Sequence, residues 1–230
     1  MKKVSLLTLA LLMMFVSVGC GKKVDDKAKN ETTQTEAKAV ADLAPNPADS
    51  LASKTFPIRN KDNTLVTIET DFGKMILELY HDVAPAHADS FVARTKDGFY
   101  KGLTFHRLVK NFMIQGGDPK GNGTGNAGYY LNAEFNELPH QDGTLSMARA
   151  QSPNSASCQF FICLARNSAT QSLDKKYTVF GQLIKGYDVL HTIGSLPVEA
   201  SAGGRGEVSK PLEEVVIRNI YVSDAEGNAL

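Results

Sequence analysis

The feature that most limits the possible folds is a series of short runs in which apolar and polar residues alternate. The first two runs, TLVTIET at residues 64–70 and KMILELY at residues 74–80, flank an Asp-Phe-Gly turn. A period of two sends alternate side chains to opposite faces of a strand, and a turn between two such runs predicts a β-hairpin. We therefore expect the folded part of the chain to begin with an antiparallel hairpin.

More strands and two helices are expected downstream. Strand patterns lie at residues 104–109, 112–115, 145–148, 159–164, 179–184 and 212–222. Residues 84–95, which open with Pro85, and residues 187–193 have patterns typical of helices. Many short strands with few helices indicate a compact antiparallel barrel or sandwich.

The strand expected at residues 159–164, QFFICL, is apolar on both faces. Alternation places Phe160 and Ile162 on one face, and Phe161 and Cys163 on the other. One face is expected to fill the core, and the other to line a site.

The first residues of the chain are typical of an export signal. A basic start precedes an apolar run at residues 4–18, which is too short to cross a bilayer comfortably. The run ends in Ser-Val-Gly-Cys, which resembles the bacterial lipobox. We expect residues 1–19 to be a signal peptide and Cys20 to be lipidated, which would anchor the protein in the bacterial cell envelope on its extracytoplasmic side. The alternative is ordinary secretion with cleavage nearby.

Residues 20–60 differ in composition from the rest of the chain. They are rich in Lys, Asp, Glu, Thr, Ala and Pro, and Phe56 is their single aromatic residue. Such a segment buries too little apolar surface to fold by itself. The sequence predicts a disordered tether here and one folded domain at residues 61–230.

The cysteines and the charge balance exclude two other features. Cys158 and Cys163 would lie about 16 Å apart in an extended strand, whereas a disulfide needs Cα atoms within about 7 Å, so both thiols are expected to be free. The chain carries 25 Lys and Arg against 25 Asp and Glu. Because nucleic-acid binding depends on neutralising phosphates, no nucleic-acid partner is expected.

The strongest functional signal is FHRLVKNFMIQGGD at residues 105–118. The guanidinium of Arg107 is always charged and presents a rigid fork of donors, so placing it in an apolar β segment is costly without a task. Met113 and Gln115 share a face of the neighbouring strand. Arg107, Met113 and Gln115 together predict an apolar surface with a polar rim.

Three segments resemble the cyclophilin family of peptidyl-prolyl cis/trans isomerases. They are this motif, SMARAQSPNSASCQFFICLA at residues 146–165, and LDKKYTVFGQLIKGYDVL at residues 173–190. The resemblance covers residues 64–224. It implies a mainly-β fold, a closed eight-stranded antiparallel β-barrel capped by two α-helices, with the active site on its outer surface. It also implies a monomer without a cofactor.

The resemblance implies roles for individual residues. Arg107 is similar to the catalytic arginine of the family. The substrate-binding residues that it implies are Phe112, Met113, Gln115, Ala148, Arg149, Gln159, Phe161, Leu173 and Tyr177. The apolar members would surround the substrate proline ring, and the backbone at Ala148 and Arg149 would pair with an extended peptide.

The chemistry of the reaction agrees with this assignment. The C–N partial double bond gives amide rotation a barrier of about 18–20 kcal/mol. A guanidinium that donates to the prolyl nitrogen as it pyramidalises would stabilise the twisted state selectively, which is the condition for catalysis. The expected partners are therefore X-Pro segments of exported polypeptides in extended conformation, and no metal is needed.

Other interpretations stay open from the sequence. The chain could be a proline-binding or chaperone module with incidental turnover, or a lipocalin-like barrel with an interior ligand, against which the bulky residues of 159–164 argue. Arg107 could form a surface salt bridge, and the apolar site residues could belong to the core. His106 is expected to pack at the rim, since amide rotation transfers no proton. Residues 123–128 spell GxGxxG without a following helix, which indicates a turn-rich loop.

Overall fold

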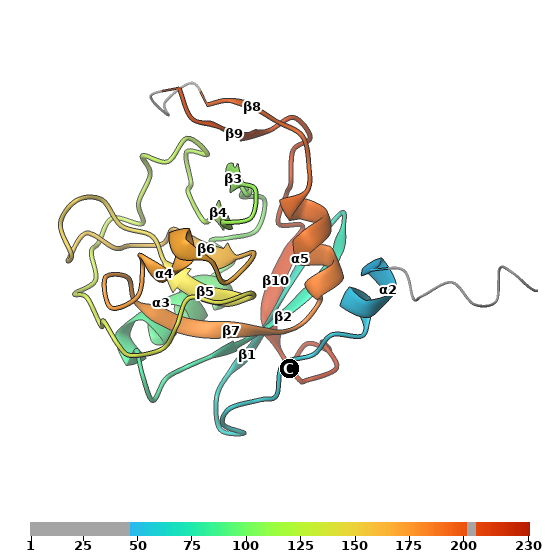
Figure 1. Cartoon of the computed structure of the whole chain (residues 1–230). Coiled ribbons are helices and arrows are strands. Elements are labelled where there is room, and N and C mark those ends of the chain that lie inside the picture. Colours follow the sequence, from blue (N-terminus) through green and yellow to red (C-terminus); the bar gives the residue numbers. More distant parts are fainter. Residues whose placement is uncertain (1–46, 202–205) are drawn as a thin grey trace, which may run out of the picture. The chain divides into compact units, whose positions relative to one another are not determined.

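The body of the protein is one eight-stranded antiparallel sheet (Figure 1). The computed structural model describes residues 47–201 and 206–230. The sheet contains β1 (Leu65–Thr70), β2 (Gly73–Leu79), β3 (Arg107–Val109), β4 (Met113–Gly116), β5 (Thr144–Met147), β6 (Phe160–Cys163), β7 (Val179–Lys185) and β10 (Asn219–Ser223). Their order across the sheet is β10-β1-β2-β7-β5-β6-β4-β3. The predicted signal peptide, Cys20 and most of the predicted tether lie outside the described residues.

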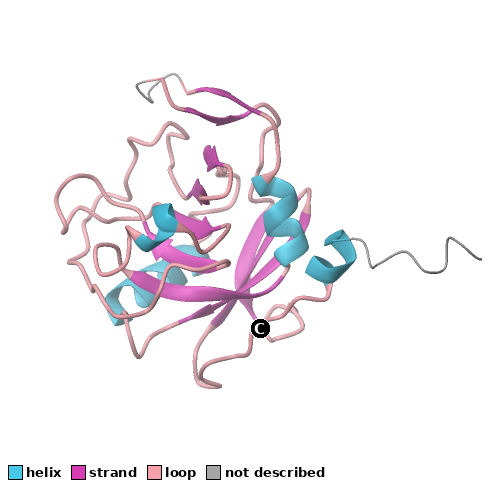
Figure 2. Cartoon of the chain, viewed as in Figure 1, coloured by secondary structure: helices cyan, strands magenta, loops and turns pink. Residues whose placement is uncertain are grey.

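Both predicted helices are present (Figure 2). Helix α3 (Pro85–Lys96) begins at a proline, whose missing N–H is not needed in the first turn, and contacts β10 and β7. Helix α5 (Tyr187–Gly194) contacts β2 and β4. None of the helices within residues 47–201 and 206–230 has the length and apolarity needed to cross a bilayer.

Four elements were not expected from the sequence: the short helices α2 (Pro47–Ala52) and α4 (Ser168–Gln171), and the strands β8 (Val198–Ala200) and β9 (Val208–Pro211), which form a hairpin. The hairpin forms a separate two-stranded sheet, at the top of Figure 1, and β9 contacts β3. It therefore places a polar segment beside the strand that carries Arg107.

The two edge strands of the large sheet, β3 and β10, are not paired by a ladder in the described part of the chain. Thr104 forms an isolated bridge with Val216, and the Phe105 amide donates to the Val215 carbonyl at 2.9 Å. These contacts precede the two strands rather than extending them, so the strands expected at residues 104–109 and 212–222 are shorter than predicted. The sheet is curled, and the closed barrel is not confirmed.

The predicted alternation in β6 is confirmed. Phe160 and Ile162 lie in the main core, whereas Phe161 and Cys163 pack with Met113 in a second cluster. In the main core, the Phe160 ring meets Phe91 edge to face with centroids 5.2 Å apart. Bulky side chains fill the space inside the curled sheet, which disfavours a lipocalin-like interior site.

The folded domain starts before residue 61, the boundary expected from the sequence. Helix α2 lies before that boundary, and the Phe56 amide donates to the Ile184 carbonyl of β7 at 2.9 Å. Phe56 also packs against the main core. Although its own composition is too polar to fold alone, this segment is stabilised by the sheet on which it lies.

A buried carboxylate secures the same segment. Glu78 in β2 has no exposed surface, and its oxygens accept hydrogen bonds from the amides of Arg59 at 2.8 Å and Asn60 at 2.9 Å. The Asn63 side chain donates a third bond at 2.9 Å. A buried charge is tolerated only when it is hydrogen-bonded in this way.

The thiols of Cys158 and Cys163 are free, as predicted, and both are buried. Burial raises the pKa of Cys158 to about 11 and that of Cys163 to about 12. Because the thiolate is the reactive form, both residues act as small apolar side chains.

We predict that Glu78→Gln lowers the free energy of unfolding by about 1–3 kcal/mol, because an amide NH2 would face backbone donors that need an acceptor. Urea unfolding of the variant and the wild-type protein measures this loss. The exposed Glu213→Gln is the matched control and should stay within about 0.5 kcal/mol. An equal effect of the two substitutions would contradict the proposed role of Glu78.

Candidate active site

The residues predicted for substrate binding and catalysis converge on one pocket of about 180 Å³. The pocket is lined by Arg107, Phe112, Met113, Gln115, Ala148, Arg149, Phe161, Leu173 and Tyr177. These are all the predicted site residues of the folded domain except Gln159. They come from segments far apart in the chain, so the fold brings them together.

The register of three neighbouring strands explains this convergence. Arg107 in β3 is paired with Gln115 in β4, and Gln115 is paired with Phe161 in β6. Residues paired across a sheet point to the same face. The strands therefore place a guanidinium, an amide and an aromatic ring in one row, with Met113 two residues along β4 on the same face.

The floor of the pocket is apolar and closely packed. Met113 is 1% exposed and Phe161 5% exposed, and both contact the fully buried Cys163 in the second cluster. Tyr177, from the loop after α4, meets the Phe161 ring edge to face with centroids 6.0 Å apart. Leu173, also after α4, packs against the same cluster. A small apolar ring is the chemical group that such a concave floor suits.

A buried polar array supports Phe161 from below. The His140 ring stacks on Phe161 with centroids 5.9 Å apart and an angle of 12° between the planes. One ring nitrogen of His140 lies 3.0 Å from Asp174, and the other lies 3.0 Å from the hydroxyl of Ser146. Ser146 and His140 have no exposed surface. Despite its resemblance to a hydrolase triad, the array cannot reach a substrate, so it holds the ring.

The ionisation of this array follows from its surroundings. Burial lowers the pKa of His140, which favours the neutral ring. Burial alone would raise the pKa of Asp174, but hydrogen bonds from Arg166 and His140 outweigh it and hold that pKa well below its usual value. His140 and Asp174 were not predicted, since no local pattern links them to the site.

Arg107 is held on two sides. Its Nη1 donates to Gln115 Oε1 at 3.0 Å and lies 3.8 Å from the sulfur of Met113, on the pocket floor. Its Nε and Nη2 donate to the two carboxylate oxygens of Glu207, each at 2.7 Å. The salt bridge considered as an alternative role for Arg107 is therefore present, but its carboxylate does not line the pocket.

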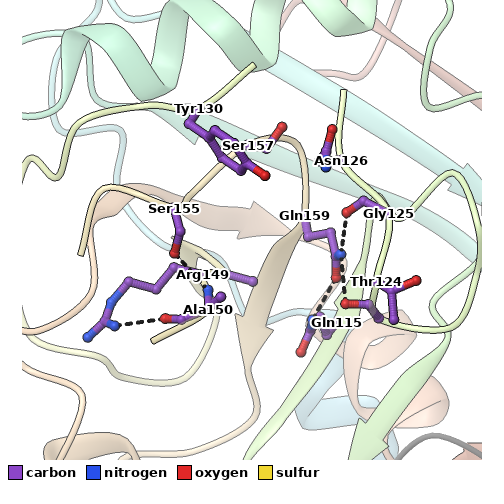
Figure 3. A pocket seen from close by; sticks show the side chains of 12 residues that line it. Gln115, Thr124, Gly125, Asn126, Tyr130, Arg149, Ala150, Ser155, Ser157 and Gln159 are labelled. Atoms are coloured by element: carbon purple, nitrogen blue, oxygen red, sulfur yellow. Dashed lines mark hydrogen bonds between the residues drawn. The ribbon is translucent and has the colours of Figure 1, made fainter. Parts of the chain in front are cut away.

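Gln115 extends this polar row away from Arg107. Its amide donates to Gln159 at 3.0 Å, and the Gln159 amide donates to the Gly125 carbonyl at 2.8 Å (Figure 3). Gln159 thus lies in a neighbouring pocket of about 280 Å³ rather than in the pocket of Arg107. The two pockets share Gln115, Ala148 and Arg149.

The glycine-rich loop forms one wall of this neighbouring pocket, where Gly123 and Gly125 lie next to Thr124 and Asn126. No helix follows the loop, which is built of turns and irregular segments as predicted. At Gly125 a Cβ atom would meet the carboxylate of Asp118 at 1.9 Å, so only glycine fits there. Its role here is close packing.

Arg149 lines both pockets and packs against Tyr177 of the pocket that contains Arg107. Its guanidinium lies 4.5 Å from the centroid of the Tyr177 ring and donates to the Lys176 carbonyl through Nε at 3.2 Å and Nη2 at 3.1 Å. The Ala148 amide is bonded to the Gln159 carbonyl at 2.9 Å. The segment after β5 is therefore fixed along the rim.

His106 lines the adjacent cavity beside Arg107, in keeping with its expected place at the rim. Burial lowers the pKa of its ring. Within residues 47–201 and 206–230, no group of three or more His, Cys, Asp or Glu side chains is placed to hold a metal ion.

The sequence is similar to known proteins whose activity fits this pocket. Residues 65–222 match the family model of the cyclophilin type peptidyl-prolyl cis-trans isomerase. A putative peptidyl-prolyl cis-trans isomerase of Staphylococcus haemolyticus is 37% identical over 202 residues, covering 74% of this chain and 98% of the relative. Peptidyl-prolyl cis-trans isomerase-like 2 of Gibberella zeae is 35% identical over 217 residues, which are 86% of this chain and 36% of that longer protein.

A solved structure shares the fold. The cyclophilin type peptidyl-prolyl cis-trans isomerase of Cryptosporidium parvum, crystallised in the presence of the dipeptide Ala-Pro, aligns with a TM-score of 0.63 and 35% identity, covering 70% of this chain and 99% of that one. The family-model match at residues 65–222 contains all the residues that line the pocket. The chain described here therefore belongs to the cyclophilin family of peptidyl-prolyl cis-trans isomerases.

Proposed function

We propose that this isomerase works outside the cytoplasm on X-Pro bonds of exported polypeptides, as a monomer held at the membrane by lipid on Cys20. The support for this location is the basic and apolar start of the chain and the Ser-Val-Gly-Cys sequence at residues 17–20. The polar segment that follows would let the domain reach extended chains near the membrane.

One observation carries the catalytic mechanism: Arg107 directs a guanidinium nitrogen toward an apolar pocket while its other donors are held outside it. The proline ring would rest between Phe112, Met113 and Phe161. In that position a guanidinium N–H would donate to the prolyl nitrogen as it loses conjugation, which stabilises the twisted amide more than either planar form.

The magnitudes show that Arg107 cannot act alone. Shortening isomerisation from tens of seconds to milliseconds is about four decades, or about 5–6 kcal/mol. One charge-assisted hydrogen bond contributes about 1.5–3 kcal/mol. The apolar pocket would contribute the remainder by holding the ring still while the preceding carbonyl rotates.

The neighbouring pocket and the segment after β5 would bind the rest of an extended peptide. Gln115 lies between the two pockets and is fixed by Gln159, so its amide can meet a substrate carbonyl without reordering. The rim at Ala148 and Arg149 would pair with the peptide backbone. Backbone pairing tolerates many side chains, which suits an enzyme with broad substrates.

Closure of the sheet into a full barrel is part of the same proposal. The bridge between Thr104 and Val216 and the bond from Phe105 to Val215 support it, because they lie where the two edges of the sheet approach each other. A closed barrel would leave no edge strand free to pair with an extended substrate in a non-productive way.

We predict that Arg107→Ala lowers the catalytic rate about 10- to 150-fold, the loss equivalent to one charge-assisted hydrogen bond. Exchange spectroscopy by NMR on a short X-Pro peptide measures the rate, and a titration measures the affinity, which should change little. Arg218→Ala, which breaks an exposed ion pair with Asp71, is the control. An unchanged rate in Arg107→Ala would remove the mechanism, and a folded wild-type protein that binds the peptide without turnover would favour a proline-binding module.

We predict that Cys20→Ser moves the protein from the membrane fraction to the soluble fraction, because the thiol that carries the lipid is lost. Cell fractionation followed by immunoblotting measures the distribution. Cys158→Ala, which removes a buried thiol of the domain, should leave the protein in the membrane fraction. A wild-type protein found in the soluble fraction would instead favour ordinary secretion.

A further inference from the structure

The contact between Arg107 and Glu207 joins the site to the β8–β9 hairpin. Glu207 directly precedes β9, and its carbonyl accepts a hydrogen bond from the Ser201 amide at 2.9 Å, next to the end of β8. Arg107 lies in β3, and Glu207 lies one residue before β9, which contacts β3. The hairpin therefore presents Glu207 at a defined place.

The geometry of the ion pair is that of a two-point clamp. The two carboxylate oxygens of Glu207 each accept one hydrogen bond at 2.7 Å, from Nε and Nη2 of Arg107. Paired bonds of this kind fix the plane of the guanidinium as well as its position. The hydrogen bond from Arg107 lowers the pKa of Glu207, so the carboxylate is ionised at neutral pH.

Glu207 contacts Arg107 from outside the proline pocket. The pocket that would hold the proline ring is lined by Arg107 but not by Glu207. Glu207 instead lines a cavity of about 530 Å³ on another side of Arg107, together with His106 and Lys210. The carboxylate therefore leaves the proline pocket free.

The Nη1 atom of Arg107, which Glu207 does not contact, lies on the side of the proline pocket. Nη1 is bonded to Gln115 and lies against Met113. With Nε and one Nη2 hydrogen taken by Glu207, the orientation of the guanidinium is determined from two opposite directions. An unrestrained arginine would lose side-chain rotamer freedom on adopting this orientation, which would slow the reaction.

We propose that Glu207 is a positioning residue for Arg107: it holds the guanidinium with its free donors facing the proline pocket before the substrate binds. This inference rests on the isomerase activity and on the role of Arg107 in it. Glu207 does not touch the substrate. Glu207 therefore affects the rate at which the bound peptide isomerises, whereas the apolar floor determines the affinity for the peptide.

The test is a double-mutant cycle on the full-length protein with a short X-Pro peptide, using Glu207→Gln, Arg107→Ala and the double variant. Glu207→Gln keeps the shape of the side chain but removes its charge. We expect a rate at saturating peptide about 5- to 30-fold below that of the wild type, with the dissociation constant within about twofold. In the Arg107→Ala background, the same substitution should cause no further loss.

Two controls separate positioning from a general effect on the hairpin. Glu199→Gln removes a carboxylate of the same hairpin that pairs with Lys210 at 2.9 Å, and it should leave the rate unchanged. Glu207→Asp keeps the charge and should recover part of the rate. In a ¹⁵N NMR spectrum, the Nε–H signal of Arg107 should be sharp and slowly exchanging in the wild type and lost in Glu207→Gln.

Several results would overturn the proposal. An unchanged rate in Glu207→Gln would show that Gln115 alone orients the arginine, and a raised rate would show that the carboxylate restrains it. An equal loss in the presence and absence of Arg107 would make Glu207 a structural residue only. A folded wild-type protein without turnover would overturn the isomerase activity itself. The results for the Glu207 variants bear only on the positioning role and leave the isomerase activity standing.

Discussion

Strand β6 is buried on both faces, and the rest of the structure depends on this constraint. One face, with Phe160 and Ile162, completes the main core, while the other, with Phe161 and Cys163, forms the floor of the site. The core that stabilises the sheet therefore also holds the pocket rigid. Because interiors are close-packed, a change in either layer is transmitted to the other. The pocket needs no loop closure to exist.

The polar residues of the site form one line across that rigid surface, from Glu207 through Arg107, Gln115 and Gln159 to the glycine-rich loop. Each member is held by the next, so the charge is oriented before a substrate arrives. Pre-oriented charge next to an apolar, weakly hydrated surface is the arrangement in which electrostatic stabilisation of a transition state is strongest. In the mechanism proposed above, this arrangement would accelerate amide rotation without a nucleophile.

Local patterns predicted much of this molecule. The strand alternation in β1, β2 and β6 and the convergence of the motif residues on one pocket followed from periodicity and from resemblance to a family. Glu207, His140 and Asp174 were not predicted, because each reaches the site through the fold; Glu207 is 100 positions from Arg107. Glu78 was missed for a related reason, since alternation cannot tell a buried hydrogen-bonded carboxylate from an exposed one. Sheet closure depends on pairing between the ends of the domain, which no local pattern specifies.

The most direct test of the account is a crystal structure of the wild-type protein with a short X-Pro peptide bound. The account predicts the proline ring on the floor formed by Met113 and Phe161, with a guanidinium N–H of Arg107 directed toward the prolyl nitrogen from one face of the amide plane and the carboxylate of Glu207 still in place. A ring seated in the neighbouring pocket beside Gln159, or a guanidinium turned away from the peptide, would contradict it.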